Sequence, residues 1–289
     1  MSIVVVTAWD VPDGSLLAGL LGSLVLHTST RDMPVRVLVP AGATPAVPHP
    51  TIALADGESV EMARTRLPDL VPGFDRYLWL DPSTWIADGA APAALADACG
   101  DGALAAVFEL DRSYRIFRSD RPPWTRYALL YNALYDRPTA RRMWMRPFID
   151  GGVLALAAGA PHWEAWRRAL DRIQPDVEAP QPFSRADAAL NVAVVLERLA
   201  LRPLPATWNW LCHFERPAWQ GRLVDPEPPH DPIGIVHLSA RSRDLTMPLA
   251  DPDGGDWHST LRFPLTVERG KPPRAGAEAT IADADADAA

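Results

Sequence analysis

Short apolar runs rich in β-branched residues alternate along the chain with stretches in which apolar residues recur every three or four positions. The apolar runs predict buried strands at 3–8, 35–39, 76–80, 103–108 and 151–156. The periodic stretches predict helices over 16–28, 59–70, 160–173 and 184–199. Two short strands follow at 201–204 and 233–238, and Pro203 makes the first of them an edge strand. Such alternation is typical of an α/β fold with a mostly parallel sheet and helices on both faces.

Two segments depart from this alternation. Residues 109–147 are irregular and rich in arginine and aromatic residues, and we interpret them as an inserted helical subdomain. From about residue 269 the chain consists mainly of Pro, Gly, Ala and Asp without periodicity, which is typical of disorder. Neither a repeat nor a clear linker precedes this tail. We therefore predict one domain over 1–268, followed by a disordered acidic tail at 269–289.

Composition narrows the class of protein. The 289 residues are 48% hydrophobic and 22% charged, which is ordinary for a soluble globular enzyme. The net charge of −8 argues against nucleic acid as a partner. Within 109–147, however, nine arginines face four acidic residues. These arginines could hold an anionic ligand, or they could form a solvated basic face.

The cysteines and the N-terminus indicate the compartment. Cys99 and Cys212 lie far apart in no metal-binding spacing, which argues against a disulfide framework and fits a reducing environment. The first residues lack the basic segment of a signal peptide and resemble a first strand. Apolar runs stay well below the roughly 18–20 residues of a membrane span. We therefore expect a cytoplasmic protein without a transmembrane segment.

Asp81 stands at the carboxyl end of the strand predicted at 76–80, because Pro82 ends that strand. In open α/β sheets, ligands bind outside the carboxyl ends of the strands. A carboxylate at this position would meet a metal-bound diphosphate or a sugar hydroxyl. Alternatively, it caps the turn that follows the strand.

The segment from Arg64 to Asp81 resembles, without a gap, the "ARLxL…DKxLYLDxD" segment of retaining nucleotide-sugar glycosyltransferases of family 8. That family has the GT-A fold, and both carboxylates of its DxD motif bind the Mn²⁺ that binds the donor diphosphate. The resemblance therefore implies a GT-A fold with Asp81 at the metal–diphosphate site. Ser83 replaces the second carboxylate, which leaves metal binding open.

Two further blocks resemble family motifs on the sugar side of the site. Phe148–Leu156 is similar to the "FNAGVxLxN" block that lines the donor sugar, with Asp150 in place of Asn and with Gly151 and Gly152. Arg185–Asn191 is similar to the "DQxxLN" helix, where Asp187 takes the Gln position. The resemblance implies that Asp150 and Asp187 are catalytic, with Asp187 a nucleophile or a stabiliser of positive charge. Asp187 could instead serve only the dipole of its helix.

The fourth block, Ile235–Arg243, resembles the "HxxGxxK" segment that ends the family pattern. There the His is a metal ligand and the Lys contacts the diphosphate, which places His237 and Arg243 in these roles. The resemblance implies an Mn²⁺ or Mg²⁺ site made by Asp81, Ser83 and His237. In the alternative, Arg64, Arg243 and a basic residue of 109–147 neutralise the phosphates without a metal.

Together the blocks imply a glycosyltransferase that moves a sugar from a nucleotide diphosphate to an unknown acceptor. The resemblance implies retention at the anomeric carbon, which Ala186 and Asp187 at the "DQ" positions leave open. The remaining donor contacts are expected at the end of the first strand, from Thr7, Ala8 and Asp10, which would hold the base and ribose. The degenerate DxD motif and the replaced Gln motivate a second hypothesis, a catalytically inactive nucleotide-sugar-binding protein. A third, a sugar-phosphate nucleotidyltransferase, is disfavoured because a Gly-rich loop does not follow the first strand.

Overall fold

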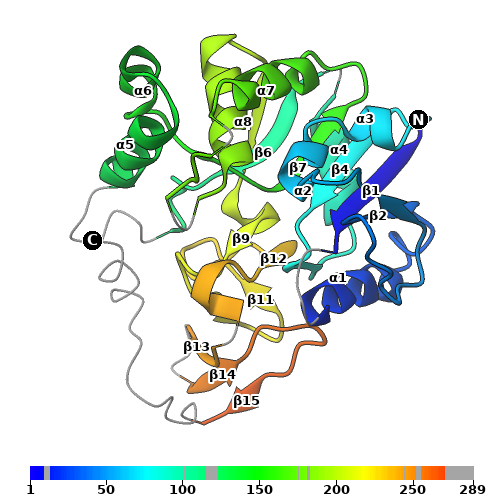
Figure 1. Cartoon of the computed structure of the whole chain (residues 1–289). Helices are drawn as coiled ribbons and strands as arrows, with labels where there is room; N and C mark the ends of the chain where they lie inside the picture. Colours follow the sequence, from blue (N-terminus) through cyan, green and yellow to red (C-terminus); the bar gives the residue numbers. More distant parts are fainter. Residues whose placement is uncertain are drawn as a thin grey trace.

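A seven-stranded sheet forms the centre of the molecule (Figure 1). The computed structural model describes residues 1–9, 14–100, 102–114, 123–174, 176–180, 183–243, 245–251 and 255–270. The strand order is β3-β2-β1-β4-β7-β6-β8. Strand β7 runs antiparallel to β4 and β6, and the other neighbouring pairs are parallel. The strands are β1 (Ile3–Ala8), β2 (Val35–Val39), β3 (Thr51–Ala53), β4 (Arg76–Leu80), β6 (Leu104–Phe108), β7 (Ile149–Ala157) and β8 (Leu201–Leu204).

Alternate strand side chains enter two separate cores, because successive residues of a strand point to opposite faces. On one face, Val5 and Leu78 pack with α1 (Ser15–Leu26) and α4 (Ala91–Ala98). On the other face, the packing helices are α7 (His162–Asp171) and α8 (Arg185–Leu196). The predicted α/β fold, a mostly parallel sheet flanked by helices, is therefore confirmed.

A second sheet brings a distant segment beside the end of β4. It has the order β5-β12-β9, formed by β5 (Thr84–Ile86), β12 (Ile235–His237) and β9 (Trp210–Leu211). Strand β12 is antiparallel to β5, and His237 pairs with Thr84. Since β5 begins three positions after Asp81, this register places His237 next to the end of β4.

The helix predicted over 59–70 is wrong as one element, because the structure has two short helices there. The first is α2 (Val60–Arg64), where the Ser59 side chain accepts a hydrogen bond from the Met62 backbone N–H. The second is α3 (Leu67–Leu70), with Pro68 in its first turn. Pro68 has no N–H to donate to the Arg64 carbonyl, so a continuous helix would lose a hydrogen bond at this point.

The segment 109–147 contains two helices in its described part, α5 (Pro123–Leu134) and α6 (Arg137–Met143). Both contact α8. That this segment is a subdomain of a single domain over 1–268 stays a prediction, and the tail from 271 lies outside the described residues. The remaining elements are the 3₁₀ helices at Ala206–Trp208 and Ala240–Arg243 and the strands β10 (Ala218–Trp219), β11 (Leu223–Val224), β13 (Met247–Leu249), β14 (Trp257–Ser259) and β15 (Glu268–Arg269).

Cys99 and Cys212 are both buried and free, as predicted from their separation. Among the described residues, the helices are too short or too polar for any of them to cross a bilayer.

Candidate functional site

The carboxyl end of β4 meets the start of β7, and this junction is the centre of the candidate site. The Asp81 backbone N–H donates to the Gly152 carbonyl at 2.8 Å, so the two sequence blocks that contain these residues are in direct contact. Asp81 Oδ1 accepts from the Ser83 backbone N–H at 2.9 Å and from the Ser83 hydroxyl. The carboxylate therefore does cap its turn, as one of the two interpretations predicted.

Asp81 is nevertheless held as an anion that faces basic groups. Burial is the largest influence on this carboxyl and favours its neutral form. The positive charge that His237 has when its ring is protonated, the two hydrogen bonds from Ser83 and the charge of Arg243 outweigh burial and lower the pKa of Asp81. Asp81 Oδ1 lies 4.0 Å from His237 Nε2, which is too far for a hydrogen bond.

Asn209 connects His237 to Asp150, and sequence reasoning gave it no role. This side chain is fully buried. Its Nδ2 donates to Asp150 Oδ1 at 2.7 Å, and its Oδ1 lies 2.9 Å from His237 Nδ1. The signal in the sequence is a polar residue between Trp208 and Trp210, in a stretch similar to the "YN" segment of the family 8 glycosyltransferases.

This network decides which nitrogen of His237 bears hydrogen. The Asp150 carboxylate, when ionised, can only accept hydrogen bonds, so the Asn209 amide must turn its NH₂ toward it and its oxygen toward His237. An oxygen acceptor at Nδ1 requires an N–H there. The lone pair of the neutral ring is then on Nε2, which points toward Asp81.

Arg64 is buried inside the protein with a fixed set of partners. Its guanidinium forms an ion pair with Asp187 and donates from Nη1 to the Gly151 carbonyl at 3.1 Å. The same group lies over Trp79 at 5.5 Å and over Trp166 at 5.3 Å from the ring centroids. Phosphate binding by Arg64 stays a prediction, and its contacts favour a role toward Asp187.

Gly151 and Gly152 leave room for the polar side chains of the site. A Cβ on Gly151 would collide with the Asp187 carboxylate. A Cβ on Gly152 would lie 2.9 Å from both Asp150 Oδ1 and His237 Nδ1. The two glycines therefore admit the protein's own Asp187 and His237, and their contact with a donor sugar stays a prediction.

Burial and mutual repulsion raise the pKa values of two carboxyl groups here. Burial, followed by the charge of Asp150, raises the pKa of Asp187 to about 6 despite the attraction of Arg64. Burial and Asp150 likewise raise the pKa of Glu109 to about 8, against the opposing effects of Arg126 and Tyr127. The site therefore contains four neighbouring carboxyl groups, and only some of them are ionised at neutral pH. They belong to Asp81, Glu109, Asp150 and Asp187.

Glu109 belongs to this region, and Asp111 does not. The Tyr127 hydroxyl, from α5, donates to Glu109 Oε2 at 2.9 Å. Asp111 instead accepts from the backbone N–H groups of Ser113, at 2.9 Å, and Ala206, at 3.3 Å, as a turn residue does. Of these two acids, Glu109 is therefore the one that faces the site.

The remaining predicted residues lie as follows. Arg243 is close enough to lower the pKa of Asp81, and its Nε donates to the Leu238 carbonyl at 3.1 Å. Thr7 and Ala8 are fully buried at the end of β1, and Thr7 Oγ1 has no hydrogen-bond partner within the described chain. Asp10 lies outside the described residues. The roles of all three toward a nucleotide stay predictions.

The donor set of Asp81, Ser83 and His237 fits a divalent cation in part. Among the described residues, no group of three or more His, Cys, Asp and Glu side chains could hold a metal. The unprotonated Nε2 nevertheless faces the Asp81 carboxylate across 4.0 Å, a span that a shared cation bridges and a hydrogen bond does not. Two protein ligands and a hydroxyl suit an ion that takes its other ligands from a diphosphate.

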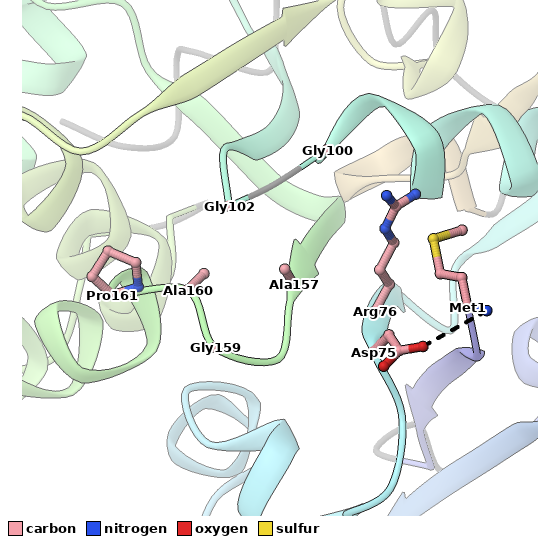
Figure 2. Close-up of a pocket in the computed structure, with 9 residues that line it drawn as sticks. All are labelled: Met1, Asp75, Arg76, Gly100, Gly102, Ala157, Gly159, Ala160 and Pro161. Carbon is pink, nitrogen blue, oxygen red and sulfur yellow. Dashed lines mark ion pairs between the residues drawn. The ribbon is translucent and has the colours of Figure 1, made fainter.

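A separate pocket lies where β4 begins and β7 ends, at the opposite strand ends from the candidate site, and few polar side chains line it (Figure 2). It is lined by Gly100, Gly102, Gly159 and the residues around Asp75. The Asp75 carboxylate already accepts from the Ser2 backbone N–H at 2.6 Å. Arg76 donates to the Ala96 carbonyl at 2.8 Å, so the polar groups of this pocket are engaged within the protein.

No family model and no curated protein matches the sequence. Among solved structures, the galactosyltransferase LgtC, crystallised with donor and acceptor sugar analogues, matches with a TM-score of 0.52 at 15% identity, over 83% of this chain and 88% of that one. An active-site mutant of LgtC gives 0.49 at 15% identity, over 81% and 86%. The chain therefore has the GT-A fold and resembles, in structure as in its sequence blocks, the family 8 glycosyltransferases.

Proposed function

We propose that this protein is a glycosyltransferase that moves a sugar from a nucleotide-diphosphate donor to an acceptor, with retention of configuration at the anomeric carbon. The proposal rests chiefly on one observation. Asp81, Asp150, Asp187 and His237, from four segments far apart in sequence, meet at the carboxyl end of β4. Ligands of α/β sheets bind at this edge. The LgtC structure, with donor and acceptor analogues, supports the same class of substrate.

Asp81, Ser83, His237 and Arg243 form the diphosphate end of the site in this proposal. A divalent cation would be held by Asp81, Ser83 and His237, and it would supply positive charge to the departing diphosphate. Arg243 lies on the same side and can bind phosphate oxygens directly. Asn209 keeps His237 Nε2 free of hydrogen by accepting from Nδ1.

Asp150 and Asp187 form the sugar end. Asp187 is fixed by Arg64 and by the close approach that Gly151 allows, so its negative charge has a defined position. A fixed carboxylate stabilises the positive charge that develops on the sugar ring in the transition state. Pairing with Arg64 lowers its nucleophilicity, so we favour this electrostatic role over a covalent one. An oxygen of the departing diphosphate accepts the proton of the incoming hydroxyl on the same face, which gives retention.

Glu109 and Tyr127 stand where α5 meets this end of the sheet, and we assign them to the acceptor side. Burial favours the neutral Glu109 carboxyl, whose pKa is raised to about 8. A neutral carboxyl at neutral pH can both donate to and accept from an acceptor hydroxyl. This role explains a buried acid that the fold itself does not need.

Ligand binding tests the proposal directly. Thermal shift and calorimetry would be measured with UDP-, GDP-, TDP- and CDP-sugars, each with and without Mn²⁺. Binding to the folded state at a hundredfold excess over Kd stabilises it by about 2.7 kcal/mol. We expect one nucleotide class to bind, and Mn²⁺ dependence would assign the cation to Asp81, Ser83 and His237. Absence of a shift with every donor would remove the transferase proposal.

A second function, nucleotide-sugar binding without turnover, is favoured by a specific observation. Ser83 replaces one carboxylate of the DxD motif, and its hydroxyl is engaged by Asp81. Release of nucleoside diphosphate from the donor identified above, measured with and without a panel of sugar acceptors, separates the two functions. Binding without any release, hydrolytic or acceptor-dependent, would support the binding protein.

A further inference from the structure

A hollow of ≈ 480 Å³ lies between the end of α6 and the end of α8, away from the candidate site. Three arginines line it, namely Arg142, Arg146 and Arg198. The rest of the lining is aliphatic, from Val194, Val195, Leu199 and Leu201. The arginines are exposed and the aliphatic side chains are buried or half-buried, so cationic groups surround an apolar interior. Figure 1 shows α6 at one edge of the molecule, beside α5.

Within the described part of the chain, carboxylates do not neutralise the positive charge of this hollow. Arg66, Arg167 and Arg168, elsewhere on the surface, each form an ion pair with a carboxylate at 2.8 Å or less. In contrast, none of the three arginines of the hollow has an ion pair or a side-chain hydrogen bond within the described chain. The whole chain has a net charge of −8, so this local excess of arginine opposes the overall charge.

The backbone at Arg198 provides an independent observation. Arg198 follows the end of α8 in the left-handed conformation, with φ of 55°. Glycine is the residue that this position favours, because a Cβ is unfavourable there. The chain nevertheless has an arginine, and it directs a third cation into the hollow. A residue that its backbone disfavours indicates a role for its side chain.

We propose that this hollow binds the phosphate headgroup of an anionic lipid and docks the protein on a membrane surface. Arginine matches phosphate oxygens with pairs of N–H groups, and the aliphatic lining suits the first carbons below the headgroup. Met145, between Arg142 and Arg146 in the sequence, is 74% exposed. Basic residues next to exposed apolar ones are typical of surfaces that lie in the membrane interface.

This site is distinct from the donor site, and its failure would leave the transferase proposal untouched. The simplest competing explanation is that cations near the ends of α6 and α8 stabilise the dipoles of these helices. That explanation predicts an effect of the arginines on folding and none on lipid. The test therefore measures lipid binding and stability on the same variants.

The full chain would be sedimented with vesicles of phosphatidylcholine alone and of phosphatidylcholine with phosphatidylglycerol. An arginine at an anionic surface contributes about fivefold to binding. We therefore expect binding only to the anionic vesicles, with a loss of about 25-fold in R142Q/R146Q and about fivefold in Arg198→Gly. The charge-matched control is R31Q/R222Q, which alters two exposed arginines outside the hollow and should bind within twofold of the parent.

Arg198→Gly tests lipid binding even if the double variant folds poorly. Glycine suits the left-handed backbone at this position, so this variant should have a higher melting temperature than the parent. Absence of binding by the parent to anionic vesicles would overturn the proposal. Equal losses in the control and hollow variants would overturn the assignment to this hollow. Displacement of the protein by millimolar glycerol 3-phosphate would identify a soluble phosphate ester as the ligand and exclude the lipid.

Discussion

At the scale of single residues, Asn209 links the two ends of the candidate site. Its amide accepts from His237 Nδ1 and donates to Asp150, so Asn209→Ala removes the acceptor that fixes the His237 tautomer. We expect the hydrogen to move to Nε2, where it faces Asp81, and stability to fall by about 1–3 kcal/mol because Asp150 loses a donor. The tautomer is measured by nitrogen-15 NMR of the imidazole ring.

Asn191→Ala is the matched control for this change. Asn191 is also a buried amide, and it bonds to the Ile149 backbone rather than to His237. The control should cost stability and leave the tautomer as it is. Nε2–H in the parent protein would contradict the orientation of the amide inferred here.

Glu109 gives a prediction for the dependence of stability on pH. Its pKa is about 8 in the folded protein, above the ordinary 4.5, so the folded state retains the proton longer than the unfolded state does. Its contribution to stability is therefore present below pH 4.5 and is lost as pH rises toward 8. Glu109→Gln keeps an acceptor for Tyr127 and does not titrate. We expect the variant to melt progressively higher than the parent from pH 6 to pH 9, measured by differential scanning fluorimetry.

The range above pH 6 is chosen because the pKa of Asp187 is raised to about 6, so its titration dominates at lower pH. Parallel pH profiles for parent and variant would show that Glu109 is already ionised in the folded protein.

Residue type and order were enough to predict several members of the site, and others depended on tertiary contacts. Asp81 was predictable because a proline ends its strand, and His237 because it follows a strand in a recognisable block. The Asn209–His237 contact joins residues 28 positions apart, and Asn209–Asp150 joins residues 59 apart. No local pattern encodes such pairs, and the first of them depends on the register of β12 against β9, the strand that follows Asn209.

At the scale of elements, the start of β7 is shaped by the side chains that pack on it. A Cβ on Gly152 would lie 2.9 Å from His237 Nδ1, so Gly152→Ala must displace the imidazole. We expect a loss of about 1–3 kcal/mol in stability, as for overpacking in a core, and a loss of Mn²⁺-dependent donor binding. Urea unfolding and calorimetry measure the two effects.

Gly159→Ala, just beyond the other end of β7, is the control, since nothing lies within 4 Å of a Cβ at that position. It should change stability by less than about 0.5 kcal/mol and leave binding unchanged. Equal behaviour of the two variants would mean that β7 yields easily at Gly152 and that the fit of His237 is not tight.

The buried strands were predicted well, including the short β8 at Leu201–Leu204, whereas β5 and the break within 59–70 were not. The strands β1, β2 and β4 have the predicted bounds, because each is a buried apolar run. The three residues of β5 are too few to show a period, yet β5 positions His237. The helix predicted over 59–70 is wrong because the prediction took no account of Pro68. The sequence shows this proline, which has no backbone N–H to continue a helix.

At the scale of the whole molecule, the Arg64–Asp187 pair connects α2, β7 and α8 on one face of the sheet. Removing only one partner leaves a buried charge without compensation, so Arg64→Ala should cost about 3–5 kcal/mol. Replacing both by apolar residues, as in R64M/D187L, removes both charges at once and should recover most of that loss. Urea unfolding of the single and double variants measures the difference.

Turnover should not recover in the double variant as stability does, and this difference separates folding from function. If the pair exists to place the Asp187 carboxylate against the donor sugar, R64M/D187L folds well but loses turnover, while Asp187→Asn retains the shape and loses only the charge. We expect donor affinity measured by calorimetry to fall less than the rate of nucleoside diphosphate release, because the carboxylate acts chiefly on charge that develops in the transition state. A double variant that is as unstable as Arg64→Ala, with unchanged release in Asp187→Asn, would make the pair a purely structural link between these elements.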